Sequence, residues 1–133
     1  MTEGSSTILV VDDEPMVLGV VKTALELAGY AVITAKDGAE ALRTFQADNV
    51  RIDLALLDYF TPGMNGPDLF RRLRELDPGI SVIMMSGYTE QLLEAFRNDP
   101  GFGGMTDVLP KPFLPSQLVA KVRGALARTS ESA

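Results

Sequence analysis

Residues 7–13 read TILVVDD, in which an apolar run is followed at once by Asp12 and Asp13. A short apolar run without polar alternation is typical of a strand that is buried on both faces of a sheet. Pro15 then stands at a suitable first position for a helix, because its missing N–H is not needed there. The stretch therefore predicts a β–α unit with two carboxylates at the end of its strand.

The same alternation of apolar run and amphipathic helix continues outward along the chain. Asp37 and Glu40 have the spacing of a capping box, which would open the second helix. Together the patterns predict five β–α units, and hence an α/β fold with a doubly wound, five-stranded parallel sheet. The expected strands are residues 7–11, 31–35, 52–58, 80–86 and 108–110, and the expected helices lie at about 15–28, 37–45, 69–76, 89–97 and 118–126.

The 133 residues are 46% hydrophobic, which suits one globular core. We expect a single domain over residues 1–133, with a core at about 7–128 and no room for an output domain. The methionines, Phe70 and Phe96 are interpreted as core residues. Glycine-rich residues 98–106 indicate a long connection, and polar residues 129–133 indicate a frayed end.

Composition excludes several function classes. The chain has no cysteine and no histidine, which rules out a disulfide framework, a Ser-His-Asp triad and a phosphohistidine on this chain. The net charge of −6 and the lack of a basic run argue against direct nucleic-acid binding. No apolar run approaches the length that spans a membrane, so no membrane partner is expected. A cytoplasmic location is compatible with all of this.

Polar residues follow four of the expected strands at the point where each strand ends. Ligands of open parallel sheets bind beyond these carboxyl ends. Three carboxylates meeting there would repel one another, so a hard divalent cation, with Mg²⁺ as first choice, would stabilise them. A carboxylate beside such a metal is a candidate nucleophile towards a phosphorylated donor. The strand-end residues are Asp12, Asp13, Asp58, Ser86 and Lys111.

Four motifs in order, VVDDEP, LLDYFTPGMNG, MMSGY and LPKPF, make the chain resemble the receiver domain family of response regulators over about residues 7–128. The resemblance implies a flavodoxin-like (βα)5 fold with strand order 2-1-3-4-5. It also implies a phosphoacceptor signalling role in a two-component phosphorelay, and no enzyme activity. The KPF and MSGYT runs are most similar to receivers of hybrid sensor histidine kinases. The implied partner is a sensor histidine kinase or a histidine phosphotransfer protein.

The resemblance assigns roles position by position. Asp58 matches the residue that becomes an aspartyl phosphate, Lys111 the lysine that pairs with it, and Ser86 the switch hydroxyl. A cis bond is expected between Lys111 and Pro112. The implied ligands of Mg²⁺ are Asp13, Asp58, the main-chain carbonyl of Phe60 and, mainly through water, Asp12.

Val108 departs from the family pattern, because the family has Tyr or Phe three residues before the lysine. The rotating aromatic switch of the family therefore has no ring at this position.

Other functions fit the same residues less well. An Mg²⁺-dependent phosphohydrolase with Asp58 as nucleophile would place a second acid two residues later, where this chain has Phe60. A flavodoxin-like cofactor carrier would need a Ser/Thr/Gly-rich loop after the first strand, where Asp12, Asp13 and Glu14 would repel phosphate. An interaction module that works without phosphorylation is the remaining alternative. Taken singly, each aspartate could also be a turn residue or a helix cap.

Overall fold

The computed structural model describes residues 6–47, 50–87, 90, 94 and 107–132. Its five strands form one parallel sheet in the order β2–β1–β3–β4–β5, which confirms the expected fold class and strand order. The strands are β1 (Thr7–Val11), β2 (Ala31–Ala35), β3 (Leu54–Asp58), β4 (Ser81–Ser86) and β5 (Asp107–Pro110). The described helices are α1 (Pro15–Leu27), α2 (Gly38–Phe45), α3 (Gly66–Leu76) and α5 (Pro115–Ser132).

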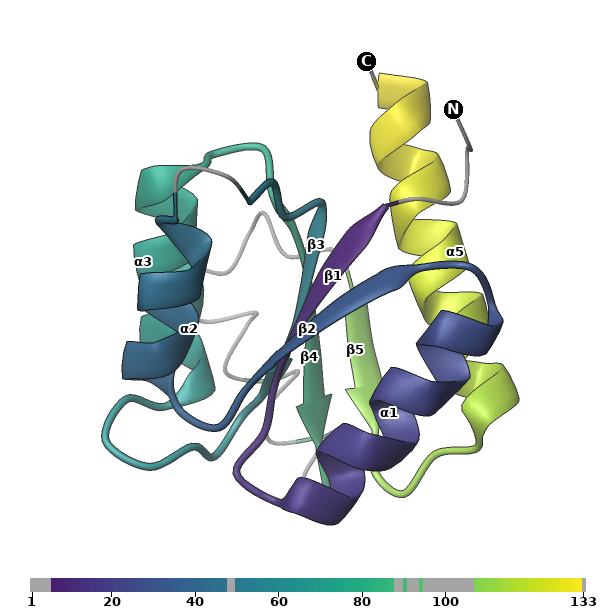
Figure 1. Ribbon diagram of the computed structural model, residues 1–133, viewed down its shortest axis with the longest axis horizontal. Helices are drawn as coiled ribbons and strands as arrows, with labels where there is room; N and C mark the ends of the chain where they lie inside the picture. The colour runs from purple at the N-terminus through teal and green to yellow at the C-terminus, as the bar shows by residue number, and fades with distance from the viewer. Residues whose placement is uncertain (1–5, 48–49, 88–89, 91–93, 95–106, 133) are drawn as a thin grey trace.

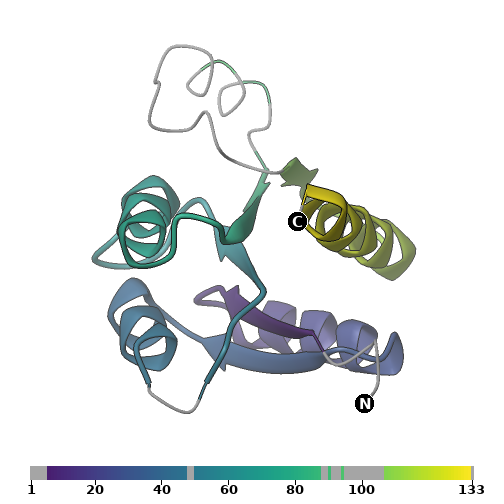
Figure 2. The same cartoon turned by 90° about the horizontal axis from the view of Figure 1, so that it is seen from above.

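Helices cover both faces of the sheet. Figure 1 shows α1 and α5 on one side and α2 and α3 on the other, and Figure 2 shows the same layers from above. Two hydrophobic clusters fill the spaces between the layers. Alternate residues of β1 enter different clusters: Leu9 and Val11 join the residues of α2 and α3, whereas Ile8 and Val10 join those of α1 and α5. Burial on both faces is the reason that this strand is apolar throughout.

Both ends of α1 and the start of α2 follow the expected signals. Pro15 is the first residue of α1, and Gly29, just beyond the helix, has a φ of 102° that favours glycine. The Asp37 carboxylate accepts the backbone N–H of Glu40 at 2.8 Å, as a capping box requires. The Glu40 carboxylate reaches one residue further back than the motif predicts, because it accepts the N–H of Lys36 at 2.8 Å.

Two sequence-based expectations are wrong. The backbone of α5 continues to Ser132, so residues 129–132 are helical rather than frayed. No glycine or proline follows Gly124 to stop the helix. Met16 is 82% exposed and is not a core residue, in contrast to the buried Met84. The apolar residues of α1 cover more of its circumference than the sheet can bury.

Part of the expected fourth β–α unit lies outside the described residues. This applies to the connection at residues 98–106, to Phe96, and to the helix at 89–97 apart from Glu90 and Glu94. No helix in the described ranges combines the length and the apolar character needed to cross a membrane.

Gly66 sets how closely α3 approaches the end of β3. Its N–H donates to the carbonyl of Tyr59 at 2.8 Å. A Cβ at this position would lie 2.7 Å from the carbonyl oxygen of Asp58 and 2.7 Å from the sulfur of Met84. Both distances are shorter than van der Waals contact, so only glycine fits here without movement of the backbone.

We expect Gly66→Ala to lower the free energy of unfolding by about 1–3 kcal/mol, the usual cost of overpacking. Gly19→Ala is the matched control: no atom lies within 4 Å of its new Cβ, and the site is exposed within α1. That change should raise the stability by about 0.5–1 kcal/mol, because alanine favours helix. Urea unfolding measures both values. A Gly66→Ala variant as stable as the wild type would show that α3 can shift at no cost.

Candidate functional site

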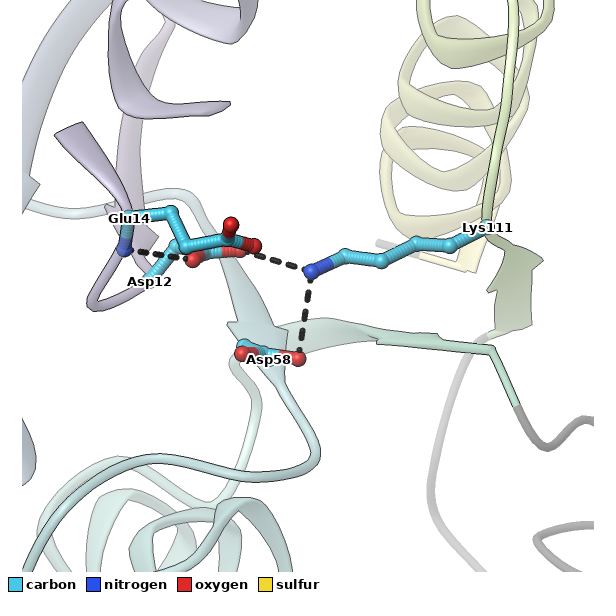
Figure 3. A network of polar contacts seen from close by, with 4 residues as sticks. All are labelled: Asp12, Glu14, Asp58 and Lys111. Atoms are coloured by element: carbon cyan, nitrogen blue, oxygen red, sulfur yellow. Dashed lines mark hydrogen bonds and ion pairs between the residues drawn. The ribbon is translucent and has the colours of Figure 1, made fainter. Parts of the chain in front are cut away.

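The predicted strand-end residues converge at one edge of the sheet. Carboxylate oxygens of Asp12, Asp13 and Asp58 all lie within 4.8 Å of one another. Lys111, which follows β5, reaches across to the ends of β1 and β3 (Figure 3). Parallel pairing causes this convergence, because every strand of the sheet ends at the same edge.

Asp12 is fully buried and has two partners. Its Oδ1 accepts the backbone N–H of Glu14 at 2.9 Å, and its Oδ2 accepts the Lys111 ammonium at 2.9 Å (Figure 3). The first contact holds the turn that leads into α1. Asp12 is thus both a turn residue and a member of the charged cluster. The sequence analysis treats these two roles as alternatives, but the structure shows both.

Lys111 is held by its backbone as well as by its side chain. Its N–H donates to the carbonyl of Ser86 at 2.8 Å, and its peptide bond to Pro112 is cis, as the resemblance implies. Its Nζ lies 2.9 Å from Asp12 and 3.4 Å from Asp58. Burial opposes the charge of the ammonium, but the hydrogen bond to Asp12 and the negative charges of Asp12 and Asp58 outweigh it, so the pKa of Lys111 is raised.

Asp58 has an unfavourable environment for a carboxylate. Its side chain is only 10% exposed. Burial, and next the charge of Asp12, raise its pKa above the ordinary value of 3.8. Lys111 and the backbone N–H of Phe60 act in the opposite direction without cancelling this effect. Lys111 therefore compensates the charge of the carboxylate that the sequence marks as the phosphoacceptor only in part.

The donor set fits a small hard cation. Three carboxylates face one ammonium in this cluster, and Asp13 is exposed, so the cluster is open to solvent. Carboxylate oxygens are the ligands that Mg²⁺ prefers, and it commonly keeps several waters in such open sites. The residues present are thus suited to an Mg²⁺ ion.

Ser86 and Phe60 lie at the same edge of the sheet. Ser86 is the last residue of β4 and is 2% exposed, and Asp58 pairs in register with its neighbour Met85. The Phe60 ring is 57% exposed and packs edge-on against Tyr59, with ring centres 4.7 Å apart. The structure thus brings both residues near the cluster, while the roles of the Ser86 hydroxyl and the Phe60 carbonyl stay predictions.

Sequence reasoning missed two contributions to the site. Gly66 is one residue of the turn-rich run 61–66, and nothing in that run reveals that its missing side chain lets α3 approach Asp58. The close contact of Lys111 with Asp12, rather than with Asp58 alone, depends on distances that no motif contains.

Val108 is 8% exposed and packs in the cluster on the α2 and α3 side of the sheet.

Comparison with known proteins gives relatives of two kinds. The chain is 38% identical over 126 residues to the sensor kinase CckA of Brucella abortus, covering 94% of this chain and 13% of the kinase. It is 36% identical over 124 residues to the DNA-binding response regulator MtrA of Mycolicibacterium smegmatis, covering 93% of this chain and 52% of the regulator. The chain thus spans about half of this regulator and a small part of the kinase.

Solved structures and a family profile agree with these relatives. A CheY-like response regulator receiver domain protein from Methanospirillum hungatei has a TM-score of 0.86 at 30% identity, over 97% of this chain and 99% of that one. NtrX from Brucella abortus has a TM-score of 0.84 at 28% identity, over 96% of this chain and 28% of that one. The profile described as the response regulator receiver domain matches residues 8–123. Together with the acidic cluster and its lysine, these matches show that the chain belongs to the response regulator receiver domain family.

Proposed function

We propose that the chain accepts a phosphoryl group on Asp58 from a phosphohistidine of another protein and signals by changing its conformation. The observation that carries this proposal is the buried Asp58 carboxylate, whose charge Lys111 compensates only in part. It lies close to the carboxylate of Asp13 and to the ammonium of Lys111. The phosphohistidine lies outside these 133 residues, because they contain no histidine. A sensor histidine kinase or a histidine phosphotransfer protein has the required chemistry.

Asp13, Asp58 and the Phe60 carbonyl would hold Mg²⁺ directly, with Asp12 acting mainly through water. When bound, the ion supplies positive charge for the phosphoryl oxygens. The burial and the ion pair of Asp12 fit the indirect role, since one of its oxygens is already engaged by Lys111 and the other by Glu14. Asp13, which is exposed, has an oxygen to offer a metal from the solvent side.

The proposed transfer is a displacement at phosphorus. An oxygen of Asp58 forms the new P–O bond, the P–N bond of the donor breaks, and the imidazole leaves with the electron pair of that bond. The ammonium of Lys111, already 3.4 Å from Asp58, is placed to pair with the phosphoryl oxygens. Ser86 then offers its hydroxyl to the phosphoryl group and moves the end of β4.

A phosphohydrolase that uses the same aspartyl phosphate is the weaker candidate. It would need an acid that protonates the leaving group and later activates water. The position two residues after Asp58 holds Phe60, whose side chain has no proton to transfer. We therefore propose a phosphoacceptor rather than a turnover enzyme.

We also propose one domain over residues 1–133, with a core at about 7–128, and a cytoplasmic location. The single sheet shared by both hydrophobic clusters supports the one domain.

Incubation with acetyl phosphate and Mg²⁺ should add the mass of one phosphoryl group to the wild type and none to Asp58→Asn. Asp68→Asn is the matched control, because Asp68 is an exposed carboxylate of α3 paired with Arg71 outside the cluster. Intact-mass spectrometry gives the result. If Asp58→Asn is labelled as fully as the wild type, the phosphoacceptor is a different residue.

Mg²⁺ should change the free energy of unfolding of the wild type more than that of variants that lack a metal ligand. In EDTA, Asp58→Asn should be more stable than the wild type, because the amide carries no charge into a buried acidic cluster. Mg²⁺ at about 100 times its Kd should then stabilise the wild type by about 2.7 kcal/mol. Neither Asp58→Asn nor Asp13→Ala should gain as much. Urea unfolding with and without Mg²⁺ tests this, and an equal gain in Asp13→Ala would exclude Asp13 as a ligand.

A further inference from the structure

Asn65 is the single asparagine of the chain that is followed by glycine. An asparagine in front of glycine loses the ammonia of its side chain more readily than one in front of a larger residue. The reason is that glycine has no side chain to hinder attack by its own backbone nitrogen. The other two asparagines, Asn49 and Asn98, precede valine and aspartate. Local chemistry therefore makes Asn65 the most reactive asparagine of the chain.

The reaction needs no partner other than water. The backbone nitrogen of Gly66 forms a bond to Cγ of Asn65, and the side-chain nitrogen leaves as ammonia with the proton of the Gly66 N–H. Water then opens the five-membered imide at one of its two carbonyls. Opening at Cγ leaves an ordinary aspartate at position 65. Opening at the main-chain carbonyl leaves an isoaspartate, in which the chain runs through Cγ.

The fold engages both reacting groups elsewhere. Oδ1 of Asn65 accepts the backbone N–H of Asp68 at 2.9 Å and so caps α3. The N–H of Gly66 donates to the carbonyl of Tyr59 at 2.8 Å. The backbone at Asn65 is extended, with a ψ of 170°, so the peptide must rotate before its nitrogen reaches Cγ. Asn65 is exposed and Gly66 is buried, so water reaches the amide while the attacking nitrogen is held away from it.

Further contacts close the turn at residues 59–66. The hydroxyl of Thr61 donates to the carbonyl of Met64, and the N–H of Met64 donates to the carbonyl of Pro62 at 2.9 Å. The side chain of Met64 packs against the hydrophobic cluster of α2 and α3. This turn and the cap of α3 must open together before Asn65 can react.

The two products have different consequences for the fold. An aspartate keeps an oxygen that caps α3, and a negative charge is favourable at the start of a helix. An isoaspartate lengthens the main chain by one atom directly before Gly66. A single added Cβ at Gly66 would already lie 2.7 Å from the carbonyl oxygen of Asp58. The isoaspartate therefore displaces α3 from the end of β3.

We propose that Asn65 is a site of spontaneous deamidation, that the closed turn before α3 suppresses the reaction, and that the isoaspartyl product loosens the support of Asp58. The product forms beside the charged cluster, so it changes the one part of α3 that contacts the backbone of Asp58. The reaction itself does not depend on phosphorylation of Asp58 or on a metal ion.

The first test compares the folded and the unfolded chain. The full chain is kept at mildly alkaline pH, in buffer or in guanidinium chloride, and peptide mapping by mass spectrometry follows each asparagine. In guanidinium chloride, Asn65 should react before Asn49 and Asn98. In buffer, Asn65 should react at least about tenfold more slowly, because two hydrogen bonds must break first. Equal rates in the two states, or faster reaction of Asn49 or Asn98 in the unfolded chain, would overturn the proposal.

The second test opens the turn without touching the reacting residues. Thr61→Val removes the hydroxyl that donates to Met64. It should speed deamidation of the folded chain by roughly threefold or more, the usual worth of one hydrogen bond, and leave the rate in guanidinium chloride unchanged. An unchanged rate in the folded variant would show that this turn does not gate the reaction.

The third test separates the two products. Asn65→Asp reproduces the aspartyl product, and its urea unfolding midpoint should match that of the wild type. The isoaspartyl form, separated by chromatography from an aged wild-type sample, should unfold at a lower urea concentration. An isoaspartyl form as stable as Asn65→Asp would contradict the proposed effect on the support of Asp58.

Discussion

Two buried carboxylates, those of Asp12 and Asp58, share the ammonium of Lys111, and the geometry and charge of the whole site depend on this arrangement. The partners come from the ends of β1, β3 and β5, and 99 residues separate Asp12 from Lys111 in the chain. Only a parallel sheet brings these ends to one edge. Because Lys111 lies closer to Asp12 than to Asp58, the carboxylate proposed to react keeps the smaller share of the positive charge.

This imbalance links stability to chemistry. A buried carboxylate without full compensation destabilises the fold, and anything that supplies positive charge there stabilises it. A metal ion bound at Asp13 and Asp58 would therefore act on the same deficit that prepares Asp58 for a phosphoryl group. Gly66 packs closely against the Asp58 carbonyl and holds this end of β3 in place. The backbone of Asp58 is therefore supported on the side of α3.

The two faces of the sheet have different surroundings. On the α2 and α3 side, the core includes Val108, whose small side chain leaves no ring to rotate. On the α1 and α5 side, apolar side chains continue beyond the core onto the surface, because Met16, Val20 and Leu27 of α1 are exposed.

The sequence by itself determined the strands, the ends of α1 and α2, and the residues of the cluster. Apolar runs that stop at Asp12, Asp58 and Lys111 carry this information locally, and the ordered motifs supplied the strand order. Only the tertiary structure decided which oxygen each charge meets, which apolar residues of α1 stay exposed, and why residue 66 must be glycine. These features depend on distances between segments far apart in the chain. Periodicity shows that Met16 and Val21 are both apolar, but only the position of the sheet determines that Val21 is buried and Met16 is not.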